Sequence, residues 1–141
     1  MLNQEVRKIM TTEPIVVGPN QSLKELAGLM DNNKVQQVPV VEDGKLVGMI
    51  TTHDLWKNLN KKENNDEQKV SELMSKNIIK ISPLDKVGTA AELFMDKRFK
   101  TLPVVNLNND LKGVVTAFDV IRHTMNKEYK TPILYKEQLE K

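Results

Sequence analysis

The chain contains one sequence pattern twice, and this internal repeat constrains its fold more than any other feature. The two copies match at a shift of 64 residues, which becomes 65 after one inserted residue in a polar loop of the second copy. Matched pairs include Val6 and Val70, Pro39 and Pro103, Gly48 and Gly113, Thr51 and Thr116, and Asp54 and Asp119. A unit of about 50 residues buries too little surface to be stable alone. The repeat therefore predicts two small units that pack together and share a core.

Each copy shows the pattern strand, helix, strand, strand, helix, which predicts a mixed α+β fold. In the first copy we expect a strand at 15–17, a helix that begins after Ser22, strands at 38–41 and 46–50, and a final helix that carries Leu55 and Trp56. The dipeptide Asp43-Gly44 indicates a tight type I′ turn between the paired strands. The corresponding runs of the second copy are 78–81, 87–95, 102–105, 111–115 and 120–125.

Composition favours a globular protein of a reducing compartment. The 141 residues include no cysteine, and charged residues make up 28% of the chain. A net charge of +2 is too small to indicate a nucleic-acid partner. The sequence has no run of about 20 apolar residues and no basic start followed by an apolar stretch. We expect a cytoplasmic protein with neither a membrane nor a nucleic-acid partner.

The Val-Pro-Val-Val strand at 38–41 and the motif Gly-x-x-Thr-x-x-Asp at the end of each copy resemble the CBS domain, named after cystathionine beta-synthase. This resemblance implies CBS repeats at 6–59 and 70–125, a linker at 60–69 and a C-terminal tail at 126–141. It also implies a tandem pair, called a Bateman module, with pseudo-two-fold symmetry and two clefts between the repeats. Many members bind AMP, ADP, ATP or another adenosyl compound such as S-adenosylmethionine in these clefts, whereas others serve as dimerisation modules.

The two acidic positions of the motif suit a ribose. One fixed carboxylate can accept hydrogen bonds from two neighbouring ribose hydroxyls, so Asp54 and Asp119 are candidate ligand-binding residues. Thr51 and Thr116 stand three residues earlier, where a hydroxyl can reach a ligand or cap the following helix. The same spacing also fits an ordinary capping box, in which the carboxylate serves the helix instead.

A phosphate requires cations or free N–H groups. The resemblance implies a basic residue shortly before the strand proline; Lys100 matches this position, whereas Gln36 occupies it in the first copy. His53 either contacts phosphate or lies on an exposed first helical turn. Lys34 and Arg98 align with each other near a helix end, where they can instead balance the helix dipole.

Adenine requires an apolar slot, for which alignment indicates Val16, Val38, Ile79 and Leu102; the alternative is that these residues are plain core. The sequence lacks a phosphate-binding loop, and His53 and His123 form neither a catalytic triad nor a metal set. We therefore predict a regulatory module that requires no cofactor, catalyses no reaction and binds an adenine nucleotide to act on an unidentified partner. The alternative is a ligand-free dimerisation or scaffold module.

The helices carry more large apolar side chains than a small two-layer module can turn inward. Leu26, Met30, Leu55, Trp56 and Leu59 belong to the first copy, and Leu93, Phe94, Val120, Ile121 and Met125 to the second. A large exposed apolar patch usually marks an interface. The sequence therefore predicts a homodimer.

Overall fold

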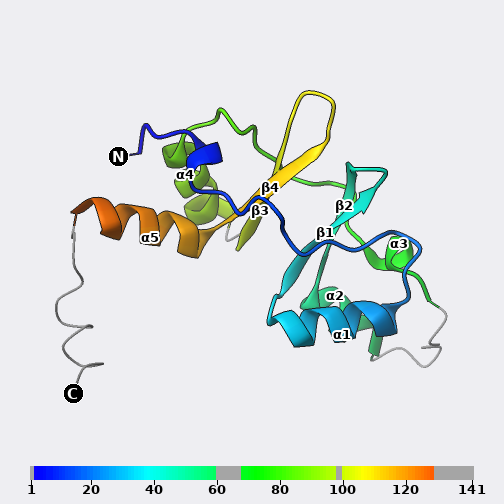
Figure 1. Ribbon diagram of the computed structural model, residues 1–141. Helices are drawn as coiled ribbons and strands as arrows, with labels where there is room; N and C mark the ends of the chain where they lie inside the picture. The colour runs from blue at the N-terminus through cyan, green and yellow to red at the C-terminus, as the bar shows by residue number, and fades with distance from the viewer. Residues whose placement is uncertain (1, 60–67, 98–99, 129–141) are drawn as a thin grey trace, which may run out of the picture.

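Each repeat contributes one antiparallel hairpin and two longer helices to the fold (Figure 1). The computed structural model describes residues 2–59, 68–97 and 100–128, so most of the predicted linker and the end of the predicted tail lie outside the described residues. The elements of the first repeat are α1 (Leu23–Asn33), β1 (Gln37–Glu42), β2 (Lys45–Thr51) and α2 (Thr52–Leu59). Those of the second are α4 (Val87–Lys97), β3 (Thr101–Val105), β4 (Leu111–Thr116) and α5 (Ala117–Glu128). The mixed α+β fold with two related halves is confirmed.

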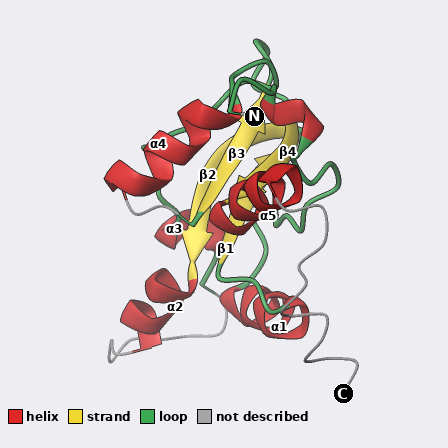
Figure 2. Ribbon diagram, turned by 90° about the vertical axis from the view of Figure 1, so that its left-hand side faces the viewer, coloured by secondary structure: helices red, strands yellow, loops and turns green. Residues whose placement is uncertain are grey.

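The two hairpins share one geometry. Strand β1 pairs with β2 and β3 pairs with β4, and both ladders shift register at the same place, after Val40 and after Val104. The first turn has positive φ angles at Asp43 (52°) and Gly44 (79°), as the predicted type I′ turn requires. In Figure 2 the strands of both sheets lie at the centre of the view, with the helices around them.

The strands predicted at 15–17 and 78–81 do not form as such. Each is reduced to one parallel bridge, Val17 with Val40 and Ile81 with Val104. Val17 donates to the Pro39 carbonyl at 3.1 Å and accepts from Val41 N–H at 2.8 Å. In the first copy Pro14 and Pro19 flank the bridge, and neither has an N–H that could donate to a longer ladder.

A short helical turn opens each copy, which the sequence reading missed, and it docks on the other copy. The 3-10 turn η1 (Val6–Lys8) lies against the second repeat, where Val6 N–H donates to the Asp85 carbonyl at 2.7 Å. Helix α3 (Val70–Leu73) lies against the first repeat, where Val70 N–H donates to the Gln21 carbonyl at 2.9 Å. Since these two bonds join equivalent positions, the exchange follows the pseudo-two-fold symmetry.

The cores show the same exchange. Each half has its own cluster of buried apolar side chains, and each cluster contains one valine from the other copy. The first cluster comprises Val17, Leu23, Leu26, Met30, Val38, Val40, Ile50 and the exchanged Val70. The second comprises Ile81, Val87, Ala90, Leu102, Val104, Val115, Val120 and the exchanged Val6. Both exchanged valines are 0% exposed, so neither core is complete without the other copy.

Equivalent positions of the two hairpins meet on the pseudo-two-fold axis. Lys45 lies opposite Asp110, and its Nζ donates to Asp110 Oδ1 at 2.6 Å. Hydrogen bonds from Lys45 and Asn106 hold the pKa of the Asp110 carboxyl below its ordinary value, so this ion pair persists to lower pH than an isolated carboxylate allows. At the other end of the strands, Lys100 Nζ donates to Gln36 Oε1 at 3.1 Å.

Truncation of an exchanged valine should destabilise the core that it completes. The Val70→Ala substitution should lower the free energy of unfolding by about 2 kcal/mol, because it leaves a cavity in the first core. Hydrogen exchange should then accelerate in β1 and β2 more than in β3 and β4. The matched variant Val6→Ala should show the reverse pattern. Faster exchange of β3 and β4 in Val70→Ala would contradict the exchanged arrangement.

Candidate functional site

Two extended segments cross between the repeats. The first, residues 75–81, begins where Ser75 pairs with Met49 of β2 and ends where Ile81 pairs with Val104 of β3. The second, residues 11–17, begins where Thr11 pairs with Val114 of β4 and ends at Val17 on β1. In Figure 1 the N-terminal trace can be followed from the half with β3 and β4 to the half with β1 and β2. We call them the 75–81 and 11–17 crossing segments.

A cleft of about 250 Å³ lies between the repeats beside the 75–81 crossing segment. Both repeats contribute to its wall. Its lining residues are Gln37, Met49, Thr51, Asp54, Ser75, Asn77, Ile78, Ile79, Thr101 and Pro103. We call it the Asp54 cleft. Six of these residues are polar and four are apolar, so the cleft offers both polar groups and apolar surface to a small molecule.

Asp54 reaches the cleft from the first turn of α2, held there by a reciprocal cap. Thr51 N–H donates to Asp54 Oδ2 at 2.9 Å, and Asp54 N–H donates to Thr51 Oγ1 at 3.1 Å. The capping box that the sequence left open as an alternative is therefore present. It occupies Oδ2 of the carboxylate, and a carboxylate offers about four acceptor positions. The cap thus fixes the side chain without exhausting its capacity to accept hydrogen bonds.

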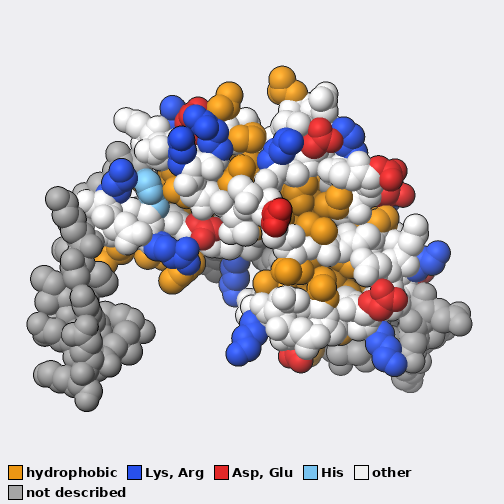
Figure 3. Space-filling model, in the orientation of Figure 1, with side chains coloured by type: hydrophobic (Ala, Val, Ile, Leu, Met, Phe, Trp, Pro, Cys, Tyr) orange, Lys and Arg blue, Asp and Glu red, His pale blue; other side chains and the backbone are white. Residues whose placement is uncertain are grey.

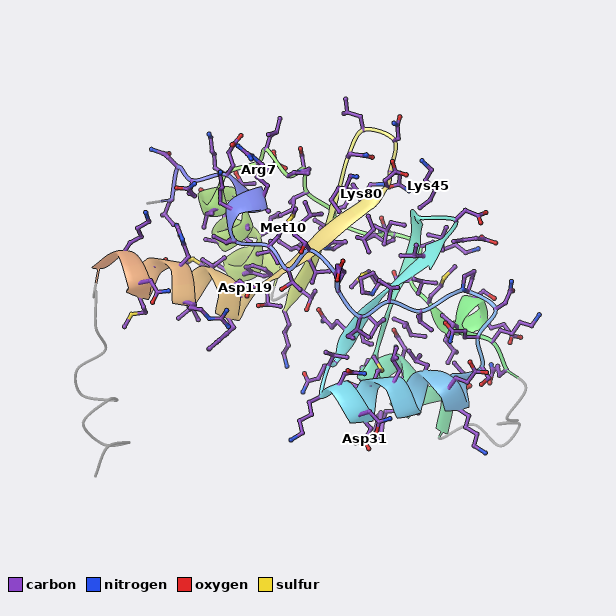
Figure 4. The ribbon with its side chains drawn as sticks, in the orientation of Figure 1. Arg7, Met10, Asp31, Lys45, Lys80 and Asp119 are labelled. Atoms are coloured by element: carbon purple, nitrogen blue, oxygen red, sulfur yellow. The ribbon has the colours of Figure 1, made fainter. Side chains whose placement is uncertain are left out.

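Asp119 is held in the same way at the start of α5, where Figure 4 labels it. Thr116 N–H donates to Asp119 Oδ2 at 2.8 Å, and Asp119 N–H donates to Thr116 Oγ1 at 3.0 Å. Its other oxygen, Oδ1, lies 3.9 Å from Arg122 Nη1. The repeat alignment places Thr11, Glu13 and Ile15 where the Asp54 cleft has Ser75, Asn77 and Ile79.

The glycine of each motif makes room for a crossing segment. A Cβ on Gly113 would collide with the Thr11 carbonyl oxygen. A Cβ on Gly48 would lie 2.5 Å from Met74 Sδ and 3.1 Å from the Ser75 carbonyl oxygen. A glycine at these positions therefore permits a close backbone approach, and the approaching backbone is the start of the crossing segment.

The predicted cations do not line the Asp54 cleft. Lys100 is exposed and bonded to Gln36, which lines a separate hollow between α1 and α2. His53 is exposed on α2, and its ring stacks on Trp56 with the centroids 6.1 Å apart. Lys34 follows α1 in a left-handed conformation with φ 54°, and Arg98 lies outside the described residues.

Of the four predicted adenine walls, Ile79 lines the cleft. Val38 and Leu102 lie in the two cores instead, at 0% and 1% exposure, and Val16 is half-exposed outside the lining. Because side chains alternate along a strand, the neighbouring Gln37 and Thr101 face the cleft. The sequence reading also missed Ser75, Asn77 and Ile78, since nothing local marks a segment that crosses to the other repeat, and it missed Met49 and Pro103 on the paired strands.

Two other features, a metal-binding group and a membrane-spanning helix, are absent from the described residues. Within 2–59, 68–97 and 100–128, no group of three or more His, Asp or Glu side chains could hold a metal ion. No helix in the same ranges is long and apolar enough to cross a bilayer.

Comparisons with known proteins identify the family of the two repeats. The family model of the CBS domain matches residues 6–55 and 70–126. The CBS domain-containing protein YhcV of Bacillus subtilis is 34% identical over 123 residues, which cover 87% of each chain.

Two solved structures are similar over most of their length. The crystal structure of CBSX2 in complex with AMP has a TM-score of 0.81 and 27% identity, and the match covers 88% of this chain and 98% of that one. The CBS domain pair of protein MJ0100, in complex with 5′-methylthioadenosine and S-adenosyl-L-methionine, has a TM-score of 0.76 and 28% identity. That match also covers 88% of this chain and 98% of the other.

Proposed function

The chain belongs to the CBS domain family, and from this premise we propose that it is a regulatory module that binds an adenine nucleotide or related adenosyl ligand between its repeats. The observation that carries the proposal is the Asp54 cleft. It brings a carboxylate from the first repeat together with Ile79 and Thr101 from the second copy. A ligand in this cleft contacts both repeats at once.

The chemistry of the cleft suits an adenosine. Asp54 has acceptor capacity left for two ribose hydroxyls, and Thr51 holds it in place. Met49, Ile79 and Pro103 offer apolar surface for a purine ring. The ligands of the two similar structures, AMP in one and 5′-methylthioadenosine and S-adenosyl-L-methionine in the other, share an adenosine moiety. Adenosine is therefore the common part of the proposed ligands.

The bound ligand would act by restraining the repeats. Each crossing segment is hydrogen-bonded to one strand in each repeat. A ligand that contacts residues 75–79 therefore favours one relative position of the repeats over others. A partner protein that contacts both repeats would respond to this change in their relative position. The module then needs no cofactor and no catalytic residue, and it acts in the cytoplasm, where adenine nucleotides are made and used.

A ligand-free scaffold is the second candidate function. The reciprocal caps give both acidic residues of the motifs a structural role, and Lys100 bonds to Gln36 rather than facing the Asp54 cleft. Binding experiments separate the two functions, because a scaffold has no affinity for adenosyl compounds.

Replacing Asp54 tests the proposed ligand site. The Asp54→Asn variant retains an oxygen that can accept from Thr51 N–H, so it should keep the cap on α2 while it loses the charge. We expect AMP affinity, measured by calorimetry, to fall about tenfold to a hundredfold, the scale of one hydrogen bond to a charged group.

The matched control is Asp85→Asn. Asp85 Oδ2 accepts from Ser82 N–H at 2.8 Å, a similar local bond away from the cleft lining, so removal of the Asp85 charge should leave AMP affinity unchanged. An Asp54→Asn variant that binds AMP as tightly as the unaltered chain would refute this site. A chain that binds none of AMP, ADP, ATP and S-adenosylmethionine would favour the scaffold.

We also propose that two modules pair through their helices. Leu26, Met30 and Val120 are buried within the module, but other apolar helix residues are not. The exposed fractions are 61% for Trp56, 62% for Phe118, 58% for Ile121 and 45% for Met125. Figure 3 shows hydrophobic side chains along the lower edge of the molecule beneath α5. A second copy would cover this surface with closed two-fold symmetry.

Sedimentation equilibrium at micromolar concentration tests the dimer. We expect a mass near twice the 16.1 kDa of one chain, with or without nucleotide. The variant Phe118→Ser/Ile121→Ser should sediment as a monomer because it removes apolar area from α5. The control Leu107→Ser, at a fully exposed position of the loop between β3 and β4, should remain dimeric. A mass near 16.1 kDa for the unaltered chain rules the dimer out.

A further inference from the structure

The backbone of the 75–81 crossing segment is anchored to the hairpins at its two ends. Ser75 pairs with β2 and Ile81 pairs with β3, each through two backbone hydrogen bonds of 2.8 and 3.0 Å. In the described part of the chain, no backbone hydrogen bond joins residues 76–80 to either hairpin. The backbone therefore leaves unfixed the stretch that brings Ile79 to the Asp54 cleft.

A side chain of the β3–β4 turn reaches this stretch. Lys80, which follows the lining residue Ile79, donates from Nζ to Asn109 Oδ1 at 2.9 Å. Asn109 lies in the turn of the second repeat, and its Nδ2 donates to the Leu46 carbonyl of the first repeat at 2.7 Å. Its own carbonyl accepts from Leu46 N–H at 3.1 Å. Asn109 therefore links the crossing segment to the hairpins of both repeats, and we call these contacts the Asn109 link.

The turn itself does not require the side chain of Asn109. This residue has a positive φ angle of 64°, which asparagine tolerates and glycine adopts freely. The equivalent position of the first hairpin is Gly44, which has a φ angle of 79° and no side chain. Lys80 has no counterpart either, because Val16 occupies its place in the first copy. The two partners of the link thus occur together, on the crossing segment that lines the Asp54 cleft and the turn beside it.

A second lysine reaches the same turn from the first hairpin. Lys45 Nζ donates to the Asn108 carbonyl at 3.0 Å and forms the ion pair with Asp110. Figure 4 labels Lys45 and Lys80 where the two hairpins meet. Lys45 joins one hairpin to the other, whereas Lys80 joins the crossing segment to the turn. The two lysines therefore offer a matched comparison between contact of the hairpins and attachment of the segment.

We propose that Asn109 is a positioning residue of the adenosyl site, because through Lys80 it holds the crossing segment, and with it Ile79, in place for a purine ring. The inference rests on the proposed function and adds to the site a residue that lies outside the cleft lining. A segment that is fixed in advance loses little conformational entropy when the ligand binds. The Asn109 link therefore raises the affinity for the ligand without contacting it.

Calorimetry with adenosine on the full chain tests this role, because an uncharged ligand does not sense the loss of a lysine charge. Asn109→Gly keeps the left-handed backbone and removes both side-chain bonds, and Lys80→Met removes the bond to Asn109 from the other side. Each should weaken adenosine binding about fivefold, the scale of one hydrogen bond. The double variant should bind as Asn109→Gly does, because both changes break the same link. The control Lys45→Met should bind adenosine within twofold of the unaltered chain.

Amide hydrogen exchange of the ligand-free chain measures the attachment of the segment directly. In Asn109→Gly the Ile81 amide should exchange faster than in the unaltered chain, since the residues before it are no longer held. The Val17 amide occupies the equivalent place of the 11–17 crossing segment, where it donates to the Pro39 carbonyl, and it should keep its rate. A role of Asn109 in the turn alone would leave both rates unchanged.

The outcomes separate this inference from the proposed function. Unchanged adenosine affinity in Asn109→Gly would overturn the positioning role, and so would an equal loss in Lys45→Met, which would assign the effect to contact between the hairpins. Losses that multiply in the double variant would also overturn it, because the two side chains would then act separately. In each of these cases the nucleotide site stands. If the unaltered chain binds neither adenosine nor AMP, the proposed function fails and the positioning role fails with it.

Discussion

The rest of the structure depends on the burial of one valine from each copy in the core of the other. Val6 completes the second core and Val70 completes the first, and both are fully buried. Because each short helical turn docks on the opposite half, the chain that follows must cross back to its own half. These two crossings form the wall between the repeats, and the Asp54 cleft lies beside one of them. The segment that lines the cleft therefore directly follows the turn that completes a core.

The motif that ends each copy serves structure and ligand binding with the same residues. Its glycine lets the crossing segment lie against the strand, as the blocked Cβ positions of Gly48 and Gly113 show. Its threonine and aspartate cap the next helix, which fixes the carboxylate before any ligand arrives. A side chain ordered in this way loses little conformational entropy on binding. The regulatory function that we propose thus uses a group that the fold already holds in place.

Local patterns in the sequence predicted the local parts of the fold. The Asp43-Gly44 turn, the paired strands and the helix after Ser22 depend on residues close in the chain, and all are present. The long-range parts were not predictable in this way. The first strand of each copy is reduced to a single bridge, the alternation of β1 and β3 buried Val38 and Leu102, and the exchange of segments brought Ser75 and Asn77 to a site that no local signal marks.

The central claim is that an adenosyl ligand binds between the repeats and contacts both. Amide chemical shifts of the ¹⁵N-labelled chain during titration with AMP test it most directly. The account predicts saturable shifts at the lining residues of the Asp54 cleft from both repeats, namely Thr51, Asp54, Asn77, Ile79 and Thr101. The amide of Gly28, on α1 and outside the lining, should stay unshifted. Shifts confined to the helices, or to one repeat alone, would contradict the account.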